Sequence, residues 1–123
     1  MKRIVTSTLL VAAVAAIPTV AFSLTDAEKA AAAASWSTHC VRCHTLDGSG
    51  SSTLGQKLKL KDYTKAEAQA SFTDEEALKA IKEGVTNSAG KKVMSPYAEK
   101  LSEQEMKDLV GVVRAFGAKK ATP

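Results

Sequence analysis

Sulfur, imidazole and aromatic side chains are all scarce in this chain of 123 residues. It has two cysteines and two histidines, and aromatic residues make up 5% of the sequence. So few cysteines exclude a small domain held together by several disulfides, and a short domain with few rings buries a modest apolar core of its own. The chain also lacks internal repeats and paired alternating segments, so we expect an all-α domain without a β-sheet.

A long hydrophobic run is missing as well. The apolar stretch Ile4–Ile17 is shorter than the ~20 residues that a membrane-spanning helix needs. A short basic start precedes it, and a proline and small residues follow it, which is the pattern of a secretory signal peptide. We therefore predict a signal peptide over 1–23, cleaved after Ala21 or Ser23, and one domain over 24–123. An uncleaved segment that serves as a membrane anchor is the alternative.

Charge of one sign is not in large excess. The chain has 17 Lys and Arg against 13 Asp and Glu, a formal net charge of +4, and loss of Lys2 and Arg3 with the signal peptide leaves +2. So small an excess, without a recognition motif, gives no support to nucleic-acid binding. Electrostatic steering of a partner would have to come from local patches.

The few cysteines and histidines are concentrated in the segment Cys40-Val41-Arg42-Cys43-His44. Two cysteines three positions apart, followed at once by histidine, match the attachment signature of c-type haem. Three positions are about one helical turn, so both sulfurs point to one side, where each can add to a haem vinyl group to form a thioether. His44 then lies under the iron, and its imidazole can serve as an axial ligand. One covalently bound haem c is the predicted cofactor, and it would supply the missing apolar core.

The same motif has two other interpretations. A Cys-x-x-Cys pair can form a redox-active disulfide, but that interpretation requires a thioredoxin-like βαβ pattern, and we predict no strands. The pair can also contribute to a zinc site, but zinc usually takes four ligands. His39 is the other histidine, and it lies too close in sequence to complete a tetrahedron.

Local patterns predict three helices and the loops between them. Each helix begins with Ser or Thr followed three residues later by Glu, the capping-box spacing that satisfies orphan backbone donors. The predicted helices run from Asp26 to about Cys43, from Asp74 to Glu83, and from Glu103 to about Gly117. Between them we expect a loop over 46–52, an extended loop with inward-facing leucines over 57–61, a helical turn over 66–70, a turn over 87–90 and irregular chain over 93–97.

The second axial ligand is expected among the methionines, because methionine is the usual partner of histidine in electron-carrying haem proteins and raises the reduction potential. Met94 is expected in a loop beside Pro96, which stiffens the backbone there. Met106 occupies an apolar position of the last predicted helix, where methionine usually fills gaps in a core. We therefore predict Met94 as the ligand, with Met106, His39 or an open position as the alternatives.

Most of the predicted domain resembles small class I cytochromes c, with the matching segments in that family's order. These segments are Trp36–His44, Asp47–Gly50, Phe72–Gly84, Met94–Tyr97, Leu101–Leu109 and Val113–Phe116. The resemblance implies a cytochrome c fold, in which the first and last helices cross and one haem lies in a crevice with an exposed edge. It also implies Cys40 and Cys43 as thioether anchors, and His44 and Met94 as axial ligands.

The chain departs from the family pattern in two places. Many members have an aromatic residue where Val112 stands, so the helix crossing is expected to pack differently here. Many also have a proline soon after the haem histidine, whose carbonyl orients the imidazole, and none occurs between His44 and Tyr63. An acceptor for the second ring nitrogen is still expected. Tyr63 and Trp36 either donate to a haem propionate or simply pack.

With both axial positions filled by side chains, a substrate has no open position on iron, which favours outer-sphere transfer of one electron over catalysis. We expect a periplasmic, monomeric electron carrier rather than an enzyme. Its partners would be redox proteins, such as a membrane respiratory complex or dehydrogenase and an oxidase or reductase. Five lysines flank the two loops expected around the haem, where they either steer docking onto an acidic partner or form an ordinary solvated face: Lys57, Lys59, Lys61, Lys91 and Lys92.

Two other functions stay open at this stage. A haem protein without Met94 on iron would keep an open site and act as a small peroxidase-like enzyme or a gas sensor. A cytochrome subunit tethered by its uncleaved signal segment would belong to a larger respiratory complex.

Overall fold

Helices make up most of the structure, a computed structural model that describes residues 24–119. The predicted all-α class is confirmed, and the predicted signal peptide lies outside the described residues. No helix within 24–119 is long and apolar enough to cross a membrane. The elements in chain order are α1 (Asp26–His39), α2 (Val41–His44), α3 (Thr53–Lys57), α4 (Ala66–Ala70), α5 (Asp74–Glu83), β1 (Val85–Thr86), β2 (Lys92–Met94) and α6 (Glu103–Ala118).

The three long helices begin at the predicted capping boxes. In each, the cap hydroxyl accepts the N–H of the third helical residue, and the glutamate at that position accepts the cap N–H in return. The helical turn α4 and the bounds of α5 are as predicted, and α6 runs one residue further. The first helix differs from its prediction, because α1 ends at His39 and Cys40 separates it from the short helix α2.

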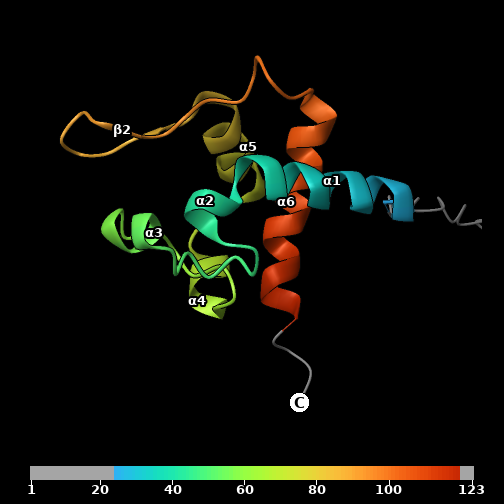
Figure 1. Ribbon diagram of the computed structural model, residues 1–123, viewed down its shortest axis with the longest axis horizontal. Helices are drawn as coiled ribbons and strands as arrows, with labels where there is room; N and C mark the ends of the chain where they lie inside the picture. Colours follow the sequence, from blue (N-terminus) through green and yellow to red (C-terminus); the bar gives the residue numbers. More distant parts are fainter. Residues whose placement is uncertain (1–23, 120–123) are drawn as a thin grey trace, which may run out of the picture.

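The core lies where α1 crosses α6 (Figure 1). Trp36 of α1 contacts Phe116 of α6, with ring centroids 5.0 Å apart. The buried apolar side chains around this contact are Ala32, Ile81, Leu101, Met106, Leu109, Val110 and Val113. Met106 is 3% exposed, which confirms its prediction as a core side chain. The crossing of the first and last helices implied by the family resemblance is therefore present.

A small antiparallel hairpin of β1 and β2 corrects the prediction that the chain has no strands. The turn predicted over 87–90 joins the two strands. Its Asn87 side chain accepts the backbone N–H groups of Ala89 and Lys91 at 3.1 and 3.0 Å, which fixes the reversal. Strands of two and three residues are too short to leave a periodic pattern in the sequence.

The segment before Tyr63 is also more helical than predicted. Ser52 caps α3 by accepting the N–H of Gly55 at 2.9 Å, and the chain leaves α3 through turns rather than as an extended loop. The inward orientation of its leucines is confirmed, because Leu58 and Leu60 are half-buried while the three lysines among them are exposed.

Candidate haem site

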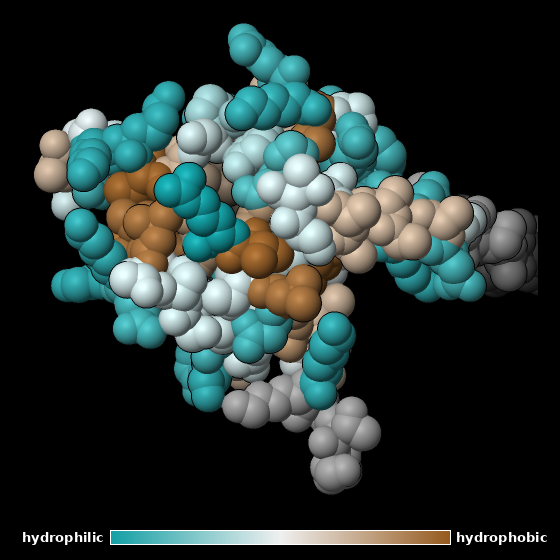
Figure 2. Space-filling model, viewed as in Figure 1, coloured by the Kyte–Doolittle hydropathy of each residue, from teal (hydrophilic) through white to brown (hydrophobic). Residues whose placement is uncertain are grey.

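A largely apolar cavity of about 280 Å³, partly open to solvent, lies between the α1–α2 corner, α5, α6 and the hairpin. Its apolar walls come from Trp36, Phe72, Ala77, Ile81, Leu109 and Val113. On the face seen in Figure 2, hydrophobic side chains gather between the hairpin and α3, with hydrophilic side chains around them. The volume lies close to the lower end of the ~300–1,000 Å³ range typical of small-molecule sites.

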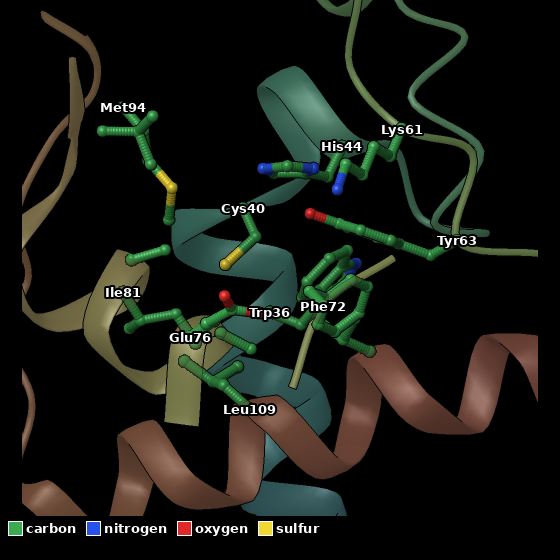
Figure 3. Close-up of a pocket in the computed structure, with 14 residues that line it drawn as sticks. Trp36, Cys40, His44, Lys61, Tyr63, Phe72, Glu76, Ile81, Met94 and Leu109 are labelled. Carbon is green, nitrogen blue, oxygen red and sulfur yellow. The ribbon is translucent and has the colours of Figure 1, made fainter. Parts of the chain in front are cut away.

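Three of the four predicted site residues line this cavity. His44 at the end of α2 and Met94 at the end of β2 extend into it from opposite sides, and Cys40 lies between them (Figure 3). Cys43 is half-buried on α2 and does not line the cavity. The structure therefore brings the Cys40 thiol and the His44 imidazole to the same cavity as the Met94 thioether, which lies 50 or more residues further along the chain. The second thiol, that of Cys43, lies on the adjoining helical turn.

The geometry disfavours the other interpretations of the cysteine motif. Both cysteines are free, and burial, with Cys43 beside it, raises the pKa of the Cys40 thiol from 9.0 to about 11. Redox-active cysteines need the opposite, a lowered pKa that favours the thiolate. Within residues 24–119 no three His, Cys, Asp or Glu side chains are grouped so that they could hold a metal ion, which disfavours a zinc site.

The His44 ring lies between two aromatic rings. Its centroid is 5.7 Å from that of Trp36 and 5.5 Å from that of Tyr63, and the Tyr63 ring is nearly parallel to it, at 20°. Burial lowers the pKa of His44, so the imidazole is neutral and can offer a lone pair to a metal. Its Nδ1 is buried and has no hydrogen-bond partner among the described residues. The expected acceptor for this nitrogen is therefore not found.

The indole N–H of Trp36 bonds the protein backbone and is therefore not available to donate to a haem propionate. Its indole Nε1 donates to the backbone carbonyl of Thr45 at 3.0 Å, and the residue is 4% exposed. Tyr63 lines the cavity, and its hydroxyl is directed into it (Figure 3). Of the two candidates for a propionate contact, Tyr63 alone keeps its polar atom toward the cavity.

The position of Met94 depends on a close backbone contact with Gly84 and on the chain that follows Met94. A Cβ added to Gly84, which has a φ of +78°, would lie 2.5 Å from the Met94 carbonyl oxygen, so glycine permits this close approach. Tyr97 donates its backbone N–H to Ile81 O at 2.9 Å and its hydroxyl to His39 O at 2.9 Å. These bonds tie the chain after Met94 to α5 and to the end of α1.

The two alternative axial ligands are placed elsewhere. Met106 belongs to the buried core and does not line the cavity. His39 packs its ring against Tyr97 at a centroid distance of 5.5 Å and also does not line it. Among the side chains considered as second ligand, Met94 faces His44 across the cavity.

The sequence analysis did not predict the hydrogen bonds that hold one wall of the cavity in place. Arg114 of α6 donates to the backbone carbonyls of Gln69 and Phe72 at 2.6 and 3.0 Å and to the Asp74 carboxylate at 2.7 Å. Gln69 in turn donates to the Tyr63 carbonyl at 2.7 Å. These bonds hold the chain that carries Phe72 and Tyr63 against α6. A partly exposed arginine on an amphipathic helix carries no sequence signal that would distinguish it from an ordinary surface residue.

The five lysines are all exposed. Lys61 also lines the cavity, and its Nζ donates to Ser71 Oγ at 2.7 Å. Together the neutral imidazole, the thioether, the Cys40 sulfur and the apolar walls are the surroundings that a haem requires, so the residues present fit this group.

Comparisons with known proteins agree with this geometry. A sequence model of the family described as cytochrome c matches residues 20–114. A protein from Nostoc sp. described as cytochrome c6-like is 37% identical over 78 residues, which are 63% of this chain and 61% of that protein's length. The solved structure of the KustC0563 c-type cytochrome is 36% identical, with a TM-score of 0.61, and the match covers 69% of this chain and 95% of that one. A mutant of the same protein gives a TM-score of 0.60 at 36% identity, over 69% of this chain and 96% of that one.

Proposed function

This chain belongs to the cytochrome c family and carries a covalently bound c-type haem, and we propose that it is a periplasmic electron carrier with histidine and methionine as axial ligands. The observation that supports this function best is the placement of His44 and Met94 on opposite sides of one apolar cavity. When bound, the haem supplies a one-electron couple at its iron.

The side chains of the site would have separate tasks. Cys40 and Cys43 would hold the haem by thioether bonds, and His44 would bind iron through the ring nitrogen that faces the cavity. Met94 would hold the iron from the opposite side of the cavity. With His44 and Met94 both holding iron, the site would offer a substrate no open coordination position, and the chemistry supplied would be transfer of one electron to a partner protein.

The walls would set the reduction potential. Trp36, Phe72 and Leu109 line the cavity with apolar side chains, and apolar surroundings disfavour the ferric haem core, which carries one more positive charge than the ferrous core. Thioether ligation by Met94 acts in the same direction, because it favours the ferrous state. Both effects support a carrier with a raised potential.

Partner binding would use the rim of the cavity. Two groups of lysines are available for this. One group is at the end of α3 and just after it (Lys57, Lys59 and Lys61), and the other belongs to the hairpin (Lys91 and Lys92). These exposed ammonium groups would steer docking onto an acidic redox protein, such as a respiratory complex, dehydrogenase, oxidase or reductase. We expect a monomer, and an association rate that falls as ionic strength rises.

Export would be directed by residues 1–23. A short basic start, an apolar stretch and small residues support cleavage after Ala21 or Ser23. N-terminal sequencing of the protein from fractionated cells tests this directly. We expect a mature protein in the periplasmic fraction that begins at residue 22 or 24, and an intact N-terminus in the membrane fraction would support the tethered alternative.

A redox titration combined with carbon monoxide exposure tests the carrier function. The account predicts a reversible one-electron couple, a low-spin spectrum in both states, and no change when carbon monoxide is added to the ferrous protein. A high-spin ferrous form that takes up carbon monoxide at once, or peroxidase turnover by the wild-type protein, would favour the enzyme or sensor instead.

A further inference from the structure

The residue after His44 has a strained backbone. Thr45 has φ 62° and ψ 164°. Within residues 24–119, Thr45 and Lys59 are the two non-glycine residues with a positive φ. The conformation of Thr45 is one that almost only glycine adopts, and it is costlier for a β-branched side chain. Such a residue persists where its surroundings hold it in place, so its contacts indicate what the strain serves.

The Thr45 hydroxyl is the centre of a hydrogen-bonded loop. Its Oγ1 lies 2.6 Å from Asp47 Oδ1 and accepts the Gly50 N–H at 3.2 Å, while Ser49 Oγ also donates to Asp47 at 2.7 Å. The Gly50 N–H points at the His44 carbonyl as well, at 3.0 Å. The Thr45 hydroxyl also lies within hydrogen-bond distance of the His44 carbonyl oxygen, so it joins the loop to the peptide unit that carries His44.

Both rings that enclose the His44 imidazole are anchored to the same loop. Trp36 donates its indole N–H to the Thr45 carbonyl at 3.0 Å, and Tyr63 donates its backbone N–H to the Gly48 carbonyl at 2.9 Å. The imidazole itself has no hydrogen bond at Nδ1 among the described residues that would fix its rotation. The ring contacts of the imidazole are with these two aromatic side chains, and each of them bonds the loop that begins at Thr45.

We propose that Thr45 is a positioning residue that sets the plane of the His44 imidazole, the task that a hydrogen bond at Nδ1 performs elsewhere. The strained turn directs the Thr45 carbonyl toward Trp36, and the hydroxyl keeps the turn closed. This inference rests on the proposed ligation of iron by His44.

The test compares Thr45→Val, which keeps the branched shape without the hydroxyl, with Thr45→Ser, which keeps the hydroxyl. Haem-methyl proton shifts of the ferric protein are the main measurement, because they follow the orientation of the axial ligand planes. Thermal unfolding is followed in parallel. Thr38→Val is the matched control, since Thr38 is exposed on α1 and bonds only its own helix, at Ala34 O.

We expect Thr45→Val to change the pattern of haem-methyl shifts and lower the unfolding midpoint, while Thr45→Ser and Thr38→Val keep the wild-type pattern. A lower midpoint with an unchanged pattern in Thr45→Val would make Thr45 a structural loop residue and overturn the proposal. An equal change in Thr45→Ser would also overturn it.

Thr45→Gly keeps the proposal testable if Thr45→Val does not assemble with haem. Glycine adopts the turn without strain and lacks the hydroxyl, so we expect folded protein with a changed shift pattern, and an unchanged pattern would contradict us. Failure of the proposed function is distinguishable from all these results, because the wild-type protein would then lack a histidine-ligated, low-spin spectrum.

Discussion

The two sides of the cavity are built in different ways. His44 closes a helix, stands between Trp36 and Tyr63, and is followed by a loop whose polar groups bond one another. Met94 ends a strand of three residues in a hairpin whose first strand has two residues, neither of them buried. We infer that the His44 side is rigid because its contacts are local and mutual, and that ligand loss would begin at Met94.

The largest expected effect comes from removing the ligand on the weaker side. Met94→Ala should open the sixth position of iron, lower the reduction potential, and allow carbon monoxide to bind the ferrous protein. Met106→Ala is the matched control, because it should cost about 2–5 kcal/mol of unfolding free energy through a core cavity and leave the spectrum unchanged. The comparison fails if Met106→Ala changes the spectrum and Met94→Ala does not.

A pair of glycine substitutions separates strain from displacement of Met94. Gly84 and Gly90 have φ values of +78° and +76°, so alanine should cost each about 1–2 kcal/mol of stability. At Gly84 the added Cβ would also meet the Met94 carbonyl oxygen at 2.5 Å, whereas at Gly90 nothing lies within 4 Å. Carbon monoxide uptake should therefore rise in Gly84→Ala alone. Equal uptake by the two variants would show that Met94 does not depend on this contact.

A smaller effect is expected where Tyr97 ties the chain after Met94 to α1. Tyr97→Phe removes the hydroxyl that donates to His39 O at 2.9 Å, which should lower the free energy of unfolding by about 1 kcal/mol. Because this bond lies on the Met94 side, weak ligands such as azide should bind the variant somewhat more readily. Denaturant unfolding and azide titration measure the two effects, and an unchanged stability would contradict the assignment of this bond.

The smallest effect concerns the pH dependence of the His44 side. Bonds from Thr45 and then Ser49 lower the pKa of Asp47 from 3.8 to about 2. A carboxyl with a lowered folded-state pKa adds stability above its unfolded pKa and loses that stability as the pH falls through the folded one. The difference in unfolding midpoint between wild type and Asp47→Asn should therefore be constant above about pH 4 and shrink toward about pH 2. A difference that does not change with pH would show that the Asp47 charge is not involved.

The sequence predicted the His44 side better than the Met94 side, for a physical reason. The Cys40–His44 spacing and the capping boxes are local signals, and the helices they predict are present with small changes in their bounds. On the Met94 side the sequence predicts the turn over 87–90 but not the two strands beside it, because strands of two and three residues leave no periodicity. The prediction of Met94 as a ligand depends on its expected loop beside Pro96, on the family resemblance of Met94–Tyr97 and on the helical position of Met106.

The supporting contacts could not be predicted because they join distant segments. Arg114 reaches Gln69 and Phe72 across more than 40 residues, and nothing near Arg114 in the sequence indicates those carbonyl partners. The strain at Thr45 is likewise invisible in the sequence, since threonine is an unfavourable residue for that backbone conformation. Such positions appear only once the fold has brought their partners together.

The central claim is that His44 and Met94 hold iron from opposite sides. The most direct test is the weak far-red absorption band that methionine ligation gives to ferric haem, recorded for the wild type, Met94→Ala and Met106→Ala. We predict the band in the wild type and in Met106→Ala and its loss in Met94→Ala. A wild-type protein without the band, or a band that survives in Met94→Ala, would contradict the account.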